Sequence, residues 1–111
     1  MITTWNEPTL EDLAKIPALY STEAVPAKDK IMHEHFFIFS CDWYIAEYSP
    51  KSQLMFGYAI LNEDYQNAEW GYVDYNELRE LSVRGVEVDR DLDWYPRKAG
   101  TIDKIVRGGG V

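Results

Sequence analysis

Hydrophobic and polar residues alternate over the middle of the chain in a pattern that predicts four consecutive strands. This part is rich in aromatic and β-branched residues, and polar turns interrupt it, as expected of strands joined by tight connections. Because the connections are short, we expect neighbouring strands to pair antiparallel as a meander. The predicted strands are residues 32–39, 43–48, 54–61 and 69–74, with the first turn at 40–42.

Helical spacing occurs before and after these strands. Leu10 and Leu13 share one face of a helix predicted at residues 8–16, and Thr9 is its expected N-cap. A second helix is predicted at 75–83, where an acidic capping pattern is followed by leucines at helical spacing. Each helix would contribute one small apolar face to the core.

The end of the chain is predicted to hold one more strand and little other structure. Residues 86–92 alternate acidic with mainly apolar side chains, which is typical of a strand with two different faces. Residues 97–111 are basic and end in a glycine run, so we expect a frayed tail. Together these elements predict a single α+β domain over residues 1–111, with an antiparallel sheet of four to five strands and two short helices.

The chain is acidic, with 19 Asp and Glu residues against 11 Lys and Arg residues and a net charge of −8. Direct binding to nucleic acid or to an anionic membrane depends on clustered basic residues, so both are disfavoured. The charge suits a protein partner that is basic, including one that itself binds nucleic acid. A charge of this size also serves solubility alone.

Three features of the sequence indicate a cytoplasmic protein. No run of about 18 apolar residues is present, so no membrane-spanning helix is expected. Residues 1–13 lack the basic and apolar stretches of a secretory signal. Cys41 is the only cysteine, which excludes an internal disulfide and a cysteine-rich zinc site.

Four carboxylates recur at every second position near the end of the chain, at Glu87, Asp89, Asp91 and Asp93. On a straight strand they would spread over about 20 Å, which does not allow them to surround one cation. Their spacing of about 6–7 Å resembles that of phosphates along a nucleic-acid strand, so Asp89, Asp91 and Asp93 are candidates for binding a nucleic-acid-binding protein. The alternative is a charged edge strand that prevents aggregation.

Arg90 falls on the opposite, mainly apolar face of this predicted strand. A buried guanidinium is costly unless a carboxylate pairs with it. Glu47 and Glu69 both lie among aromatic residues in predicted strands, so they are the expected partners of Arg90 in a structural ion pair.

His33 and His35 are candidates for a metal site, since alternate residues of a strand point to the same face about 7 Å apart. Zinc would need further ligands, which Glu47 or an acid of the last strand could supply. Histidines at a strand end also occur without a metal, and no cofactor is predicted. With Arg90, these residues define an enzyme alternative, a small metal-dependent or acid–base catalyst. Cys41 could act as a thiol nucleophile beside the histidines, but its predicted place in a tight turn favours a plain structural residue.

Eight aromatic residues lie in or beside the second, third and fourth predicted strands. Alternation lets only about half of them face one core. The others would either line an exposed sheet face suited to a partner or be covered by the helices and the tail. Gly57 and Gly71 each lie between aromatic residues, where a glycine inside a strand indicates a bulge or the close approach of another chain segment. The candidate partner-binding residues are Trp43, Tyr58, Trp70 and Tyr72.

Short motifs in a fixed order run through residues 13–102. They are Pro-x-Leu-Tyr-Ser-x-Glu at 17–23, Phe-Phe and Trp-Tyr-Ile-Ala-Glu within 36–47, Phe-Gly-Tyr at 56–58, Glu-Trp-Gly-Tyr at 69–72, Asn-Glu-Leu at 76–78 and Val-Glu-Val-Asp-Arg-Asp-Leu at 86–92. In this order the chain resembles domain of unknown function family 2958. The resemblance implies a small bacterial α+β protein, often encoded on plasmids and other mobile elements, with no established activity. The family usually has Glu-Arg-Asp where this chain has Asp89-Arg90-Asp91.

These features together predict a non-enzymatic protein-interaction module, and the resemblance implies an accessory protein of a mobile element. The module would bind its partner through an aromatic sheet face and an acidic edge. Two alternatives stay open: an acidic DNA mimic that inhibits a nucleic-acid-binding defence protein, and the small enzyme described above.

Overall fold

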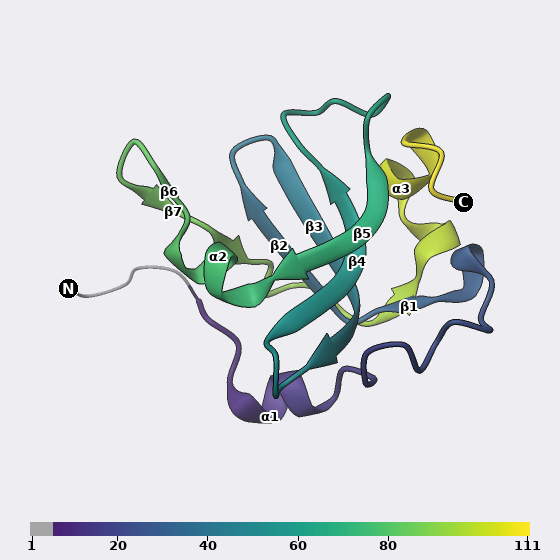
Figure 1. Cartoon of the computed structure of the whole chain (residues 1–111). Helices are drawn as coiled ribbons and strands as arrows, with labels where there is room; N and C mark the ends of the chain where they lie inside the picture. The colour runs from purple at the N-terminus through teal and green to yellow at the C-terminus, as the bar shows by residue number, and fades with distance from the viewer. Residues whose placement is uncertain (1–5) are drawn as a thin grey trace.

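The computed structural model describes residues 6–111, so residues 1–5 of the N-terminal segment considered above lie outside the described residues. Five strands form one antiparallel sheet in the order β5–β4–β3–β2–β8, and three short α-helices pack around it (Figure 1). This arrangement confirms the predicted α+β class. The strands of the sheet are β2 (Glu34–Ile38), β3 (Cys41–Ser49), β4 (Leu54–Ile60), β5 (Glu69–Asp74) and β8 (Asp89–Arg90).

The remaining elements are short and lie around the sheet. None of the helices in residues 6–111 is long and apolar enough to cross a membrane. Two further pairs of strands form, β1 (Ile31–Met32) with β9 (Arg97–Lys98) and β6 (Ser82–Val83) with β7 (Val86–Glu87). The helices are α1 (Leu10–Ala14), α2 (Tyr75–Glu80) and α3 (Asp103–Arg107), with 3-10 turns at Ala27–Asp29 and Ala99–Thr101.

Local sequence determines where α1 and α2 begin. Thr9 and Asp12 form a reciprocal capping box, in which the Asp12 N–H donates to Thr9 Oγ1 at 3.1 Å and the Thr9 N–H donates to Asp12 Oδ2 at 2.9 Å. At α2, the Asn76 N–H donates to the Asp74 carboxylate at 2.9 Å. The two capping signals read from the sequence are confirmed.

The first hairpin turns earlier than predicted. The turn expected at 40–42 is wrong, because Cys41 already pairs with Ile38 and the connection consists of Phe39 and Ser40 alone. Phe39 has a φ of 49°, the left-handed conformation that two-residue hairpin turns favour. The shorter turn fixes the register in which β2 pairs with β3.

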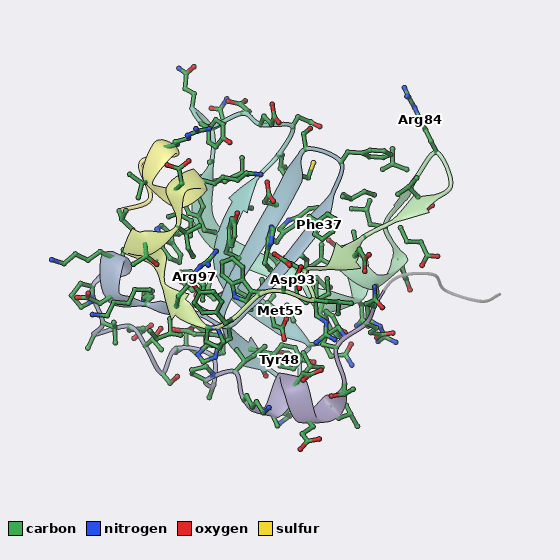
Figure 2. The ribbon with its side chains drawn as sticks, turned by 180° about the vertical axis from the view of Figure 1, so that it is seen from behind. Phe37, Tyr48, Met55, Arg84, Asp93 and Arg97 are labelled. Carbon is green, nitrogen blue, oxygen red and sulfur yellow. The ribbon has the colours of Figure 1, made fainter. Side chains whose placement is uncertain are left out.

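The helix predicted at 75–83 and the strand predicted at 86–92 are both shorter than expected. The helix α2 ends at Glu80, and the β6–β7 hairpin follows, with Arg84 and Gly85 at φ values of 53° and 79° in its turn. Figure 2 shows Arg84 at the tip of this hairpin, away from the sheet. After the hairpin, β8 joins the main sheet beside β2.

Both faces of the sheet are covered. One face packs against α1 and α2, whose Leu13 and Leu78 are buried in a common cluster. The other face packs against the C-terminal segment that contains α3 (Figure 1). Ile102 and Ile105 of this segment are buried in a second cluster with Tyr58. Of the two arrangements left open by the sequence, the covered one therefore holds for the centre of the sheet, whereas Tyr72 on the edge strand β5 is exposed.

The C-terminal segment is an ordered part of this second cluster, so the frayed tail predicted at 97–111 is wrong. Ile105 is fully buried, and the glycine run that follows lies against the Tyr58 ring. A Cβ atom would come within 2.2 Å of Tyr58 at Gly108 and within 2.6 Å of it at Gly110. The glycines therefore allow the chain to approach an aromatic ring closely, and they do not mark a loose end.

The packing of this segment predicts that replacing Ile105 with alanine lowers the free energy of unfolding by about 2–5 kcal/mol, because the change leaves a cavity in a closed core. Val106 is 47 % exposed, and its replacement with alanine should change the free energy by less than about 0.5 kcal/mol. Urea denaturation of both variants checks the prediction. Equal, small effects at the two positions would indicate a frayed tail after all.

Candidate functional site

Glu47 is a buried carboxylate at the point where β3 becomes irregular. The register between β3 and β4 shifts just before it, so that Ala46 forms a bulge. A bulge redirects the neighbouring side chains. The segment 17–23 runs beside this part of β3, where the Tyr48 N–H donates to the Pro17 carbonyl at 2.9 Å. Glu47 therefore lies beside that loop.

Three hydrogen bonds join the loop to Glu47, which is only 3 % exposed. Its carboxylate accepts from the Tyr20 N–H at 2.7 Å and from the Thr22 N–H at 3.1 Å, and the Thr22 hydroxyl also donates to it. The Lys30 ammonium donates to the carbonyl and the hydroxyl of Thr22. Since hydrogen bonds to a carboxylate are stronger than neutral ones, Glu47 fixes the conformation of the loop.

Tyr20 has a left-handed backbone conformation in this loop. Its φ is 70°, which is unusual for a bulky residue and costs about 1–3 kcal/mol. The Tyr20 side chain is nevertheless 55 % exposed, so packing of the ring does little to offset the cost. Backbone strain that the surrounding structure maintains is typical of binding and catalytic sites.

The loop presents Tyr20 to two aromatic rings of the sheet, and the three rings line an open cavity of about 250 Å³ that we term the aromatic cleft. The Tyr20 and Tyr72 rings meet edge to face at 6.2 Å, and Phe56 lies 5.3 Å from Tyr72. Tyr72 on β5 is also 55 % exposed. Three charged residues complete the lining of the aromatic cleft: Glu23, Lys30 and Glu47.

Two carboxylates of the aromatic cleft lie close enough to Tyr72 to act on its hydroxyl group. Desolvation raises the pKa of Tyr72, and the neighbouring Tyr20, Glu23 and Glu47 raise it further. Aromatic faces themselves attract cations, and the Lys30 ammonium lies 5.9 Å from the centre of the Phe56 ring. The aromatic cleft therefore combines aromatic faces and two carboxylates, which favour a positively charged ligand, with one resident cation, Lys30.

A second cavity, of about 300 Å³, lies beside β8, and we term it the edge cavity. It is more polar than the aromatic cleft and is lined by groups from α1, from the start of β2 and from the segment after β8. Its lining residues are Asp12, Lys15, His33, Glu34, Arg90, Asp91, Leu92, Trp94 and Pro96.

Arg90 pairs with carboxylates of the edge cavity. Its Nη1 lies 2.9 Å from Asp12 Oδ2 and 3.6 Å from Glu34 Oε1. The predicted partners were Glu47 and Glu69, and neither is an ion-pair partner of Arg90 in the described part of the chain. Glu69 is exposed on β5, and Glu47 is occupied by the loop at the aromatic cleft.

The residues of the enzyme alternative are separated in the structure. His33 and Arg90 line the edge cavity, His35 lies in the buried network described next, and Glu47 lies at the aromatic cleft. Burial lowers the pKa of His33, and burial raises the pKa of Glu34 against the opposing effect of Arg90. Although these two pKa values are shifted, His33, His35, Glu47 and Arg90 do not lie together as the catalytic group that the sequence suggested.

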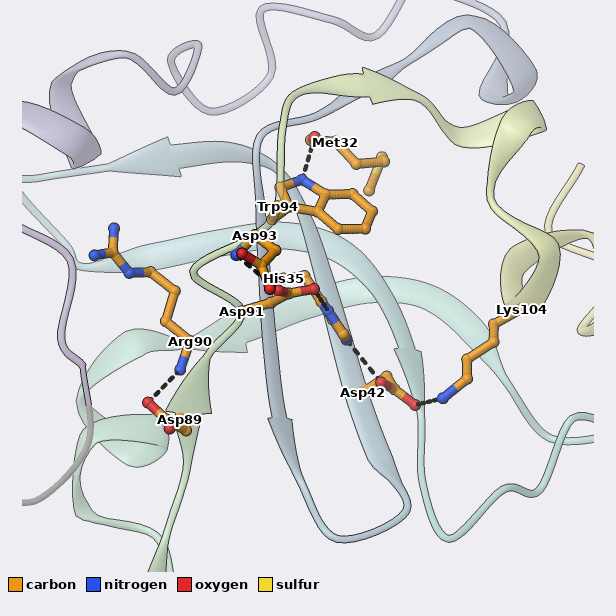
Figure 3. Close-up of polar contacts among 9 residues, drawn as sticks. All are labelled: Met32, His35, Asp42, Asp89, Arg90, Asp91, Asp93, Trp94 and Lys104. Carbon is orange, nitrogen blue, oxygen red and sulfur yellow. Dashed lines mark hydrogen bonds and ion pairs between the residues drawn. The ribbon is translucent and has the colours of Figure 1, made fainter.

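His35 is the centre of a polar network that crosses the second face of the sheet (Figure 3). Its Nε2 lies 2.7 Å from Asp42 Oδ1, and its Nδ1 lies 3.1 Å from Asp91 Oδ2. The second oxygen of Asp42 accepts from the Lys104 ammonium at 2.9 Å. The imidazole also stacks on Tyr44 at 4.5 Å. Because both ring nitrogens are engaged, His35 ties β2, β3, α3 and the segment after β8 together.

This network predicts acid sensitivity. Burial raises the pKa of Asp42, but hydrogen bonds from His35 and Lys104 outweigh it, so the net pKa lies below the ordinary 3.8. A carboxyl group whose pKa is lower in the folded than in the unfolded protein stabilises the fold at pH values above its unfolded pKa. This stabilisation is lost as the pH falls through the folded pKa. We expect an Asp42→Asn variant to be less stable than the parent protein at neutral pH, with a difference that narrows below pH 3.8. Denaturation curves that stay parallel into acid would contradict this.

The four acidic residues near the end of the chain do not form the predicted line of free carboxylates. Asp89 accepts from the N–H groups of Asn6 and Arg90, both at 2.8 Å. Asp91 Oδ2 lies 3.1 Å from His35 Nδ1, and Asp91 Oδ1 accepts from the Asp93 N–H (Figure 3). Asp93 itself is exposed, and the segment is divided between β7 and β8. Two of the three candidate aspartates are thus committed to internal contacts.

The structure divides the predicted aromatic contact residues. Tyr58 is 1 % exposed, so it belongs to the core and the prediction that it contacts a partner is wrong, whereas Trp43 is 8 % exposed and lines an open cavity on the opposite face from Tyr72. Trp70 is half-buried and donates from Nε1 to the Gly110 carbonyl at 2.8 Å. Tyr72 alone is well exposed, at the aromatic cleft.

In the described part of the chain, the candidates for metal binding and for thiol chemistry lack the arrangement of neighbouring side chains that such chemistry needs. Among residues 6–111, no group of three His, Cys, Asp or Glu side chains is arranged to hold a metal ion. The Cys41 sulfur contacts Asn62, whose N–H lies 3.4 Å from it. Cys41 begins β3 and packs against the first core cluster, as expected of a structural residue.

Comparisons of the chain with protein-family models, curated proteins and solved structures find no match. The resemblance to family 2958 therefore stays a prediction. Its motif at 17–23 nevertheless contains Tyr20, a functional candidate that is absent from the contact residues predicted above. The only signal for Tyr20 in the sequence was that motif, since nothing nearby indicated a left-handed backbone.

Proposed function

We propose that the protein is a non-enzymatic interaction module that binds a basic segment of a partner protein at the aromatic cleft. The observation that carries the proposal is the exposed, strained Tyr20, which Glu47 holds against Tyr72. Exposed tyrosines that are rigidly placed supply much of the binding energy in protein interfaces. The net charge of −8 and the nearby carboxylates favour a basic partner.

A defined probe tests the proposal in place of the unknown partner: a capped heptapeptide of alternating valine and arginine, compared with one of alternating valine and glutamate. We expect the arginine peptide to bind more tightly. Replacing Tyr20 or Tyr72 with alanine should weaken its binding about tenfold, as expected for the loss of a cation–π and packing contact. Isothermal titration calorimetry provides the measurement.

The matched control is Tyr95, which is 61 % exposed but lies outside the aromatic cleft. Tyr95→Ala should bind the arginine peptide as the parent protein does. Equal binding of the arginine and glutamate peptides, or equal losses in all three tyrosine variants, would refute docking at the aromatic cleft.

A further inference from the structure

The outer edge of β5 is open, and it runs directly past the aromatic cleft. The strand β5 ends the sheet on this side, and none of the described residues pairs with its outer edge. An unpaired edge strand presents N–H and C=O groups that can pair with another extended chain. Figure 1 shows β5 beside β4, and the strand order places β8 at the opposite margin of the sheet.

Side-chain cavities flank β5 on both faces of the sheet. Tyr72 projects to the face of the aromatic cleft, where it packs beside Phe56. Val73, the next residue, packs against the opposite face. There a third open cavity, of about 330 Å³, is lined mainly by apolar side chains, including Leu61 and Leu81, and we term it the apolar groove.

The two cavities match the alternation of a strand. Successive side chains of an extended chain point to opposite faces, so one set would enter the aromatic cleft and the other the apolar groove. Recognition by strand addition works in this way: backbone hydrogen bonds supply affinity, and cavities for alternate side chains supply specificity. Tyr72 lines both cavities, which places them on the two sides of the same short stretch of β5.

Charge along this edge indicates which chain can bind there. Glu69 and Asp74 lie at the two ends of β5, and Glu77 lines the apolar groove. If two copies of this protein paired antiparallel along the whole of β5, Glu69 of each copy would lie opposite Asp74 of the other. Like charges directly opposite each other are destabilising, so the edge disfavours a second copy. The same acids favour a basic chain.

We propose that the partner segment binds as an added strand along the outer edge of β5, with a basic side chain in the aromatic cleft and an apolar side chain in the apolar groove. This inference rests on the proposed function, and it adds the backbone conformation and the side-chain pattern of the partner. The sequence class it specifies is an extended segment in which basic and apolar residues alternate.

The test uses the valine–arginine heptapeptide in two methylated forms. In one form the backbone amides of the arginines are N-methylated, and in the other those of the valines are. In an added strand, successive backbone N–H groups point alternately toward β5 and away from it. The form whose methyl groups replace the N–H hydrogens that face β5 should therefore lose about tenfold or more in affinity. The other form should bind within about twofold of the unmodified peptide, since its methyl groups face solvent.

Amide hydrogen exchange supplies an independent readout. Outward-facing amides within Glu69–Asp74 should exchange more slowly when the unmodified peptide is bound. If both methylated forms bind equally, exchange in β5 is unchanged and Tyr20→Ala still weakens binding, strand addition is overturned while the proposed function stands. If the unmodified peptide does not bind at all, that result refutes the proposed function itself, and with it the strand addition that rests on it. Sedimentation that reveals a dimer joined through β5 would instead identify a second copy as the occupant and overturn the inference.

Discussion

Replacing Glu47 with alanine is expected to lower the free energy of unfolding by about 2–4 kcal/mol, because each buried donor that loses its acceptor costs about 1–3 kcal/mol. The Tyr20 and Thr22 N–H groups and the Thr22 hydroxyl all lose the carboxylate. Relief of the strain at Tyr20 offsets part of the loss. The same change should weaken binding of the valine–arginine peptide by about tenfold or more, since nothing then holds Tyr20 beside Tyr72 and the aromatic cleft also loses a carboxylate.

The control for Glu47 is Glu69, an exposed glutamate on the neighbouring part of the sheet. Glu69→Ala should change the free energy of unfolding by less than about 0.5 kcal/mol. Glu47→Gln should lie between the parent protein and Glu47→Ala, because an amide retains one acceptor oxygen but not two. Urea denaturation of the three variants provides the measurement. A Glu47→Ala protein as stable as the parent would remove the structural basis for the aromatic cleft.

Replacing Gly57 with alanine is expected to cost about 3 kcal/mol or more, or to prevent folding, since overpacking a rigid site is strongly destabilising. A Cβ at this position would lie 1.9 Å from the Tyr44 carbonyl oxygen and 3.0 Å from the Ile45 Cα. These are backbone atoms of the central strand β3, and they cannot move away without breaking its pairing with β4.

Gly71 is the matched control, because it pairs directly with Gly57 across β4 and β5. A Cβ at Gly71 would meet no atom within 4 Å. Gly71→Ala should therefore leave the stability unchanged or raise it by about 0.4–1 kcal/mol, through the reduced freedom of the unfolded chain. Thermal denaturation of both variants measures the contrast. Similar effects at the two positions would contradict the described approach of β3 to β4.

The sheet could be predicted from the sequence because its signals are local. Strand β5 has the predicted bounds, 69–74, and the capping residues Thr9 and Asp74 begin the helices as expected. The boundaries that failed depend on turn conformations at Phe39 and Arg84, two residues whose positive φ has no strong local signal. Such turns are set by the strands that they join.

The C-terminal segment was misjudged because its composition resembles that of a loose tail. Gly108 and Gly110 are required because they lie against Tyr58, which precedes Gly108 by 50 residues in the chain. Ile102 and Ile105 lie three residues apart in the sequence, which is a helical signal, but the basic and glycine-rich residues around them obscured it. Contacts between residues far apart in the sequence therefore determine the conformation of the C-terminal segment.

The candidate site was predicted least well, for the same reason. The sequence identified Glu47 as a carboxylate among aromatic residues, but its partners are backbone N–H groups 25 and 27 residues away. Arg90 was correctly expected to need a carboxylate, and it found Asp12, 78 residues away. Residue type indicates that a buried charge needs a partner, whereas only the fold determines which group is within reach.

The most direct test of the central claim is an NMR titration of the ¹⁵N-labelled protein with the valine–arginine heptapeptide. We predict that chemical-shift changes concentrate at Tyr20, Phe56 and Tyr72, which line the aromatic cleft. Changes that concentrate at His33 and Arg90 would place binding in the edge cavity, and the absence of any change would exclude a basic ligand. Either result would contradict the proposed function.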